Sequence, residues 1–270
     1  MSSATPSVLR LEKSGGVATL TFDRPEQRNA MGFGSDPADF LARAAELNAD
    51  ETISCVIITG AGKSFSAGGD IKQLREWAHH AKMHPKELLA LYEDGIHHLV
   101  QALWSLEMPV VAAINGAAIG LGNDLACLAD IRIAAASAKF GATFLKIGLV
   151  PGDGGAWLLP RIIGWDRAAE LYFTGKVIDA QTALDYRLVT HVVDDAELMT
   201  SAQALAETIC QQPPQVLRLT KKLMRAGIQQ SFPEVMTLSA AYQAIAHLTD
   251  DHREALDAMH DKRPPLFTGR

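Results

Sequence analysis

The stretch INGAAIGLGNDLACLADIRIAA, Ile114 to Ala135, decides the fold of this chain. The run Val110 to Ile114 that leads into it is typical of a buried strand, and Ile131 to Ala135 is typical of a second one. Between them, Gly120 and Gly122 stand where a strand turns into a short apolar helix. Glycine there lets the backbone approach a ligand closely, and the helix start that follows presents unpaired N–H groups at its positive end. The stretch therefore predicts an anion or oxyanion site.

A carboxylate accompanies these donors. Asp124 lies two residues after Gly122, in the first turn of the same predicted helix. One carboxylate beside oriented N–H groups is typical of enolate or acyl chemistry. The same residue types also occur as plain turn glycines and as an aspartate that complements the helix dipole. The rest of the chain decides between these two interpretations.

Length and composition exclude several classes of protein. A chain of 270 residues can bury one large core, with or without a small helical appendage. Cys55, Cys127 and Cys210 form no CxxC pair, which disfavours a disulfide framework or a zinc site and fits a reducing, cytoplasmic setting. The sequence shows neither the pattern of a secretion signal nor an uncharged apolar run of about eighteen residues. Secretion and membrane spanning are therefore disfavoured. A net charge of -6 without a basic block argues against nucleic-acid binding.

A second turn of small residues follows the predicted buried strand Cys55 to Thr59. Its first part, Gly60 to Ser64, is not a phosphate loop, because Ile57 stands where that motif needs glycine, and it lacks the third glycine of a dinucleotide fingerprint. The next part, FSAGGDI at 65–71, again leads from a strand region into a helix. The sequence thus predicts two sets of backbone donors.

Two loops carry further candidates. The polar loop after the predicted hairpin of Val8 to Lys13 and Val17 to Phe22 holds Arg24 and Arg28, which either meet phosphate or are solvated charges. The Pro- and Gly-rich loop before a helix at about Gly155 has one acid, Asp153. That residue is either a turn or cap residue or a catalytic one.

The order of elements indicates the architecture. One long helix is expected from His84 to Met108, and its His97 and His98 lack the spacing of metal ligands. Strands and helices alternate as far as residue 195, after which only helices are predicted. We therefore expect an α/β core over 1–195 that contains the active site and a helical C-terminal region over 196–270.

Several separate motifs together resemble the crotonase, or enoyl-CoA hydratase/isomerase, superfamily. They occur in that family's order and cover about two thirds of the chain: Asp23 to Met31, Phe65 to Ile71, Asn115 to Leu125, Ala129 to Ala134, and Phe140 to Gly152. The resemblance implies a spiral of ββα turns with a helical C-terminal region that mediates trimerisation, commonly as a dimer of trimers.

The resemblance also implies a chemistry. Substrates of the family are acyl-CoA thioesters, and the reaction passes through an enolate whose oxygen two backbone N–H groups hold. Carried over by position, these donors are Gly69 and Leu121, and no metal or redox cofactor is implied. The implied coenzyme A contacts are Ser66, Ala67, Gly68, Asp70 and Ile71, with Arg24 and Lys262 for the phosphates.

The proton carriers depart from the hydratase pattern of the family. The first of the two carboxylates falls on Asp124, one methylene shorter than glutamate, and the second falls on Phe144, which exchanges no proton. Asp153 is the replacement that this resemblance suggests, one residue from the position at which related isomerases and dehalogenases carry an aspartate.

These residues lead to three hypotheses. The first is an enoyl-CoA hydratase with Asp124 and Asp153 as the acid/base pair. The second is an enoyl-CoA or dienoyl-CoA double-bond isomerase, for which one carboxylate suffices. The third is a non-catalytic acyl-CoA binding protein that keeps the pocket without the chemistry.

Overall fold

The larger of two sheets follows the predicted strands closely. A computed structural model describes residues 7–32, 34–80 and 84–270. In this part of the chain a six-stranded sheet has the order β1-β2-β3-β5-β7-β10. Strands β1 and β2 are antiparallel, and the other neighbours are parallel. The strands are β1 (Leu9–Ser14), β2 (Val17–Phe22), β3 (Cys55–Gly60), β5 (Val110–Ile114), β7 (Ile131–Ala135) and β10 (His191–Val193).

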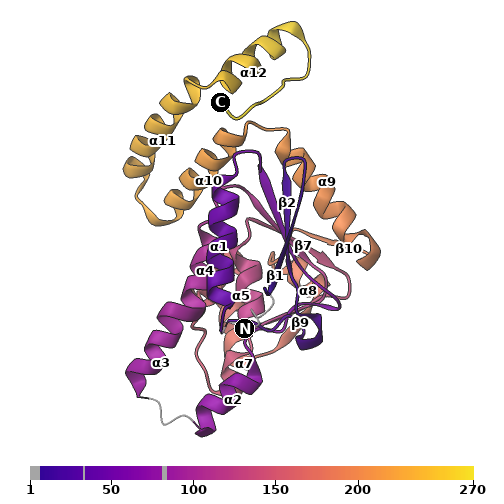
Figure 1. Ribbon diagram of the computed structural model, residues 1–270, viewed down its shortest axis with the longest axis vertical. Coiled ribbons are helices and arrows are strands. Elements are labelled where there is room, and N and C mark those ends of the chain that lie inside the picture. The colour runs from indigo at the N-terminus through magenta and orange to yellow at the C-terminus, as the bar shows by residue number, and fades with distance from the viewer. Residues whose placement is uncertain (1–6, 33, 81–83) are drawn as a thin grey trace, which may run out of the picture.

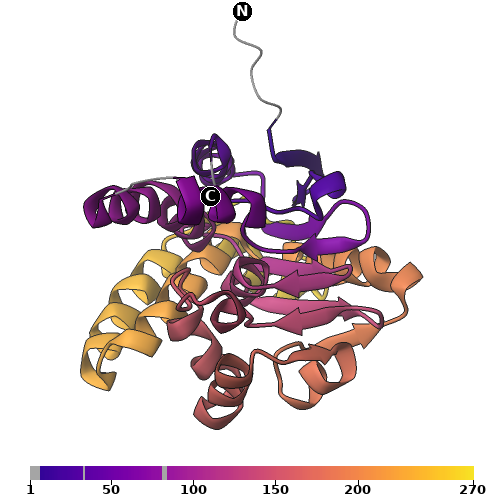
Figure 2. The same cartoon turned by 90° about the horizontal axis from the view of Figure 1, so that it is seen from below.

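A smaller sheet lies beside the first. Its order is β4-β6-β8-β9, and its strands are β4 (Ser64–Ser66), β6 (Ala117–Ile119), β8 (Lys139–Gly141) and β9 (Val177–Asp179). Each of β4, β6 and β8 directly follows a strand of the larger sheet and leads into a helical segment. This repeat is the ββα spiral that the resemblance implies. Figure 2 shows strands side by side through the centre with helices around them.

The helices follow in chain order. Those of the core are α1 (Asp36–Ala49), α2 (Ile71–His80), α3 (Pro85–Leu91), α4 (His97–Trp104), α5 (Leu121–Leu128), α6 (Gly155–Ile163), α7 (Trp165–Thr174) and α8 (Ala180–Asp185). The C-terminal ones are α9 (Leu198–Cys210), α10 (Pro214–Gln229), α11 (Phe232–His247) and α12 (Asp250–Asp261). Short 3-10 turns lie at Pro25–Gln27, Phe144–Ile147 and Asp195–Glu197.

One predicted helix is divided. The segment expected to be a single helix from His84 to Met108 contains a π-helical turn at Tyr92–Ile96 and ends at Trp104. Its end is capped locally by the Ser105 hydroxyl, which donates to the Ala102 carbonyl, and from outside by the Arg225 guanidinium, which donates to the Trp104 carbonyl. Hydrophobic periodicity does not report such tertiary caps, and π turns are often found at functional sites.

Helices cover both faces of the larger sheet. In β3, Cys55 and Ile57 face the cluster that includes α9, whereas Val56 and Ile58 face the main core. Both sets are fully buried, as is typical of a parallel strand. In Figure 1, α9 lies on one side of the strands, and α1 and α4 lie on the other.

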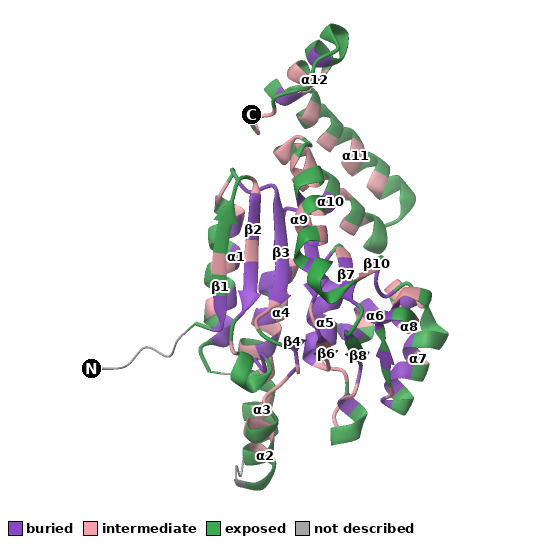
Figure 3. Cartoon of the chain, turned by 90° about the vertical axis from the view of Figure 1, so that its right-hand side faces the viewer, coloured by how far each residue is buried: buried purple, intermediate pink, exposed green. Residues whose placement is uncertain are grey.

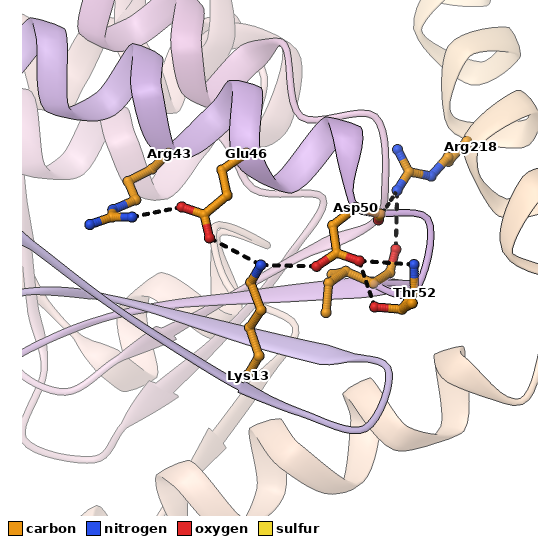
Figure 4. A network of polar contacts seen from close by, with 7 residues as sticks. Lys13, Arg43, Glu46, Asp50, Thr52 and Arg218 are labelled. Carbon is orange, nitrogen blue, oxygen red and sulfur yellow. Dashed lines mark hydrogen bonds and ion pairs between the residues drawn. The ribbon is translucent and has the colours of Figure 1, made fainter.

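Helix α10 is attached to the core by its basic residues. The Arg218 guanidinium donates to three carbonyls at the end of α1, those of Asn48, Asp50 and Ile53. Figure 4 shows Arg218 above this turn, next to the network in which Lys13 of β1 bridges Glu46 and Asp50. Asn48 lies in the last turn of α1, and Asp50 and Ile53 follow it, so these contacts attach α10 to the end of α1 and to the turn after it.

The last two helices extend away from the sheet. Helix α11 contains no buried residue, and it lies with α12 beyond α10 in Figure 1 and Figure 3. Large apolar side chains are exposed along this region, including Phe232, Leu248 and Met259. No helix among the described residues combines the length and the apolar character needed to cross a bilayer.

The buried contact of α10 gives a stability prediction. The Lys221 ammonium is 2.7 Å from Asp130 Oδ2 and donates to the Met108 carbonyl at 2.8 Å. Lys221→Ala would leave both acceptors without this donor, so we expect the free energy of unfolding in urea to fall by about 2–4 kcal/mol. Lys222→Ala is the control, because its ion pair with Glu107 is exposed and is worth about 0–1 kcal/mol. Equal effects of the two substitutions would contradict this assignment.

Candidate active site

Two glycine-containing turns meet at the end of the β4–β6 pair. Strands β4 and β6 are parallel neighbours, so the turns that follow them lie together. A Cβ on Gly68, whose φ is +93°, would lie 2.6 Å from the Ile119 carbonyl oxygen. A Cβ on Gly122 would lie 2.2 Å from the Ser66 carbonyl oxygen. Only residues without a side chain permit this approach of the two backbones.

The approach brings together the two donors that the sequence predicts. Gly69 and Leu121 both line one cavity. Leu121 is the first residue of α5, where N–H groups have no partner within the helix. Neither the Gly69 nor the Leu121 N–H donates to another residue in the described part of the chain. The two groups are therefore free to bind an oxygen atom, and that role stays a prediction.

The cavity is lined by cationic and by apolar side chains. Its volume is about 590 Å³. The exposed side chains of Arg28 and Lys63 line it together with apolar side chains that include Leu74 and Leu149. Phe144 also lines it, so the position at which hydratases of the family carry a second carboxylate contributes only a ring. A cavity of this kind suits a ligand with an anionic head and an apolar tail.

Asp153 is the one carboxylate among the described residues that line this cavity. It is 5% exposed, and burial raises its pKa to about 6, while the nearby His97 acts in the opposite direction. The His97 Nε2–H donates to the Gly152 carbonyl at 3.0 Å, which holds the loop that carries Asp153. A carboxyl group with a pKa close to neutrality suits general acid–base catalysis.

Asp124 is not among the residues that line the cavity. It is fully buried, and its Oδ2 accepts the Gly155 N–H at the start of α6 at 3.1 Å. Its Oδ1 has no partner among the described residues. Burial first, and the charge of Asp153 second, raise its pKa well above the ordinary range. A Cβ on Gly155 would lie 2.1 Å from Oδ1, so this carboxyl fills the space that the glycine leaves.

The predicted coenzyme A contacts are divided. Ala67 and Ile71 line the cavity together with Gly69. The Ser66 hydroxyl points inward, donating to the Asn29 carbonyl and accepting the Gly68 N–H. Asp70 begins α2 by accepting the Lys72 N–H. The segment is at the site, but only part of it faces the ligand space.

The two predicted phosphate ligands do not reach the cavity. The Arg24 guanidinium forms a two-point ion pair with Asp36, whose oxygens lie 2.7 and 3.2 Å away. Lys262 ends α12, in the region beyond α10. The cations that do line the cavity are Arg28 and Lys63. The sequence offered Arg28 only as one of two loop arginines, and it missed Lys63, whose one signal is its place beside the FSAGGDI turn.

Comparison with known proteins identifies close relatives. Residues 12–270 match the family model described as "Enoyl-CoA hydratase/isomerase". The chain is 37% identical to a 1,2-epoxyphenylacetyl-CoA isomerase of Escherichia coli (strain K12), over 94% of this chain and 96% of that protein. It is 34% identical to a short-chain-enoyl-CoA hydratase of Clostridium acetobutylicum, over 94% of each. A crystal structure of an enoyl-CoA hydratase from Bacillus anthracis superposes with a TM-score of 0.90 at 32% identity, covering 98% of this chain and 100% of that one.

The burial of Asp153 predicts a pH dependence of stability. Its pKa is about 6 in the folded protein and about 3.9 when unfolded, so the folded state holds the proton over this window. The free energy of unfolding therefore falls as pH rises from about 4 through 6, and Asp124 acts in the same sense. Asp153→Asn removes this titration. We therefore expect its free energy of unfolding in urea, relative to that of the wild type, to increase by about 2–3 kcal/mol from pH 4 to pH 7.

The exposed Asp166→Asn serves as the control, because it makes the same chemical change at a side chain in solvent. A pH-independent difference for Asp153→Asn would show that its carboxyl does not titrate near pH 6 in the folded state.

Proposed function

The chain belongs to the enoyl-CoA hydratase/isomerase family, and we propose that it is an enoyl-CoA hydratase that adds water across the double bond of a 2-enoyl-CoA thioester. The observation that carries the proposal is the meeting of two unpaired N–H groups, those of Gly69 and Leu121, with one buried carboxyl in a single cavity. Such a cavity can hold a thioester carbonyl and move a proton near it.

The polarity of the cavity orients the substrate. Arg28 and Lys63, which line the cavity, attract the phosphates of coenzyme A, because guanidinium and ammonium groups bind phosphate oxygens. The thioester carbonyl then lies at the two N–H groups, and the acyl group points toward Leu74 and Leu149. Asp153 lines the same cavity and, in this proposed orientation, faces the acyl group.

Asp153 carries the proton in the proposed reaction. As a carboxylate, it takes a proton from water while the water oxygen bonds to C3 and the C2–C3 π electrons move to C2 and the thioester oxygen. The Gly69 and Leu121 N–H groups stabilise the resulting enolate. Asp153 then returns the proton to C2, so the product gains one water and the enzyme is unchanged.

Asp124 supports this reaction without lining the cavity. Its protonated side chain, favoured by burial, puts no second negative charge beside the enolate. Its contact with the Gly155 N–H fixes the start of α6, two residues from Asp153. The pairing of Asp124 and Asp153 as two proton carriers remains the alternative mechanism.

Double-bond isomerisation is the second candidate function. The aromatic wall at Phe144 favours it, because the position contributes no group that would activate water. In that reaction Asp153 takes a proton from C2 of a 3-enoyl-CoA and delivers it to C4. The enolate oxygen is held by the same two N–H groups.

We further propose a cytosolic homotrimer, or a dimer of trimers. Free thiols at Cys55, Cys127 and Cys210 support a reducing compartment. The exposed apolar side chains on α11 and α12 support burial against another copy of the chain. Sedimentation equilibrium is expected to give a mass of three or six chains at micromolar concentration, and a monomer would overturn this proposal.

The activity prediction uses the absorbance of the conjugated thioester. We expect it to fall when the protein meets trans-2-enoyl-CoA, and Asp153→Asn to lower kcat/KM by about 100-fold or more. Asp124→Asn is expected to cost less than about tenfold, because an amide oxygen can still accept the Gly155 N–H.

Comparable losses of about 100-fold in both variants would restore the mechanism with two proton carriers. Flat absorbance with the 2-enoyl substrate and a rise with a 3-enoyl-CoA would favour the isomerase instead. Binding without turnover of either substrate would mean that the protein is a non-catalytic acyl-CoA binder.

A further inference from the structure

A second cavity adjoins the first. Its volume is about 500 Å³, and it lies among α2, α3, the π-helical turn and the 3-10 turn at Phe144–Ile147. The two cavities have five lining residues in common, and these form their junction: Ile71, Leu74, Tyr92, Ile147 and Leu149. The second cavity is therefore a continuation of the candidate active site.

The junction is formed by residues other than the two cations. Arg28 and Lys63 line only the first cavity, while Leu74 and Leu149 line both. A thioester bound with its phosphates at the cations has its acyl chain directed through this junction. The π-helical turn supplies Tyr92, which lines both cavities, whereas Asp153 lines only the first.

The lining of the second cavity is mainly apolar. Trp77, Ala78 and Leu88 extend it beyond the junction, and Arg75 and His79 belong to its wall. Ile71 and Ile147 are 58% and 51% exposed at the junction. An apolar ligand would cover both.

We propose that this second cavity receives the distal part of a long acyl chain, so that the substrates are acyl-CoA thioesters with acyl groups well beyond four carbons. The inference rests on the proposed acyl-CoA binding. In this proposal a four-carbon acyl group ends near Asp153. A longer acyl group passes Tyr92, and its distal methylenes leave water and pack against the apolar side chains of the second cavity. Each methylene buried there strengthens binding roughly threefold to fourfold.

Ala78 offers a way to close the cavity without touching the catalytic groups. It lines the second cavity but not the first, and it is exposed on α2. Ala78→Trp would fill the space that the chain is proposed to occupy. Glu76→Trp is the matched control, because Glu76 is exposed on the same helix and lines neither cavity.

The test measures binding of saturated acyl-CoA thioesters by calorimetry, which requires no turnover. We expect the wild type to bind decanoyl-CoA at least about 30-fold more tightly than butanoyl-CoA. Ala78→Trp is expected to weaken decanoyl-CoA binding by about tenfold or more and to leave butanoyl-CoA within about twofold. Glu76→Trp is expected to change neither. The same pattern is expected in kcat/KM for the matching 2-enoyl-CoA substrates.

Equal affinity of the wild type for the two thioesters would overturn this inference and leave the proposed function standing. That result is expected if another copy of the chain fills the second cavity. Equal effects of the two tryptophan variants would also overturn it. If no acyl-CoA binds, the proposed function fails with it, so the two failures are distinguishable.

Discussion

The site depends on how closely two backbones approach between β4 and β6. A Cβ on Gly116 would lie 2.1 Å from the Lys63 carbonyl oxygen, and one on Gly122 would lie 2.2 Å from that of Ser66. Because these contacts leave no room for a side chain, the turn at Gly68–Gly69 lies directly against the start of α5. The free N–H groups of both turns then open into the same cavity. One steric constraint thus creates the binding geometry.

The second feature of the site is a pair of buried carboxyl groups, which the fold holds at a cost in stability. Asp124 and Asp153 both lie out of solvent near the start of α6, and burial disfavours ionisation of both. Apolar side chains buried on both faces of the larger sheet stabilise the fold and offset this loss of stability. A carboxyl with a raised pKa accepts and returns protons near neutrality, so the same burial that lowers stability suits the group to catalysis.

The sequence predicts those parts of the structure that depend on interactions between residues close together in the chain. Buried runs such as Cys55–Gly60 are local patterns, so the main strands and the α/β class were correctly predicted. The donor role of the two glycine turns stays a prediction. The three-residue strands β4 and β6 are too short for periodicity to reveal. The ion pair of Arg24 with Asp36, and the place of Lys63 at the cavity, depend on how distant elements pack. Local sequence carries little information about such contacts.

The same geometry explains why hydration and isomerisation are closely related here. Both proposed reactions use an enolate held by Gly69 and Leu121 and a proton carried by Asp153, three residues that line one cavity. What differs is whether a water molecule or C4 of the substrate stands beside that carboxyl. Phe144 gives water no polar partner on one wall, so the shape and length of the acyl group decide how much water remains near Asp153. The apolar lining of the cavity therefore affects the choice of reaction as well as the choice of substrate.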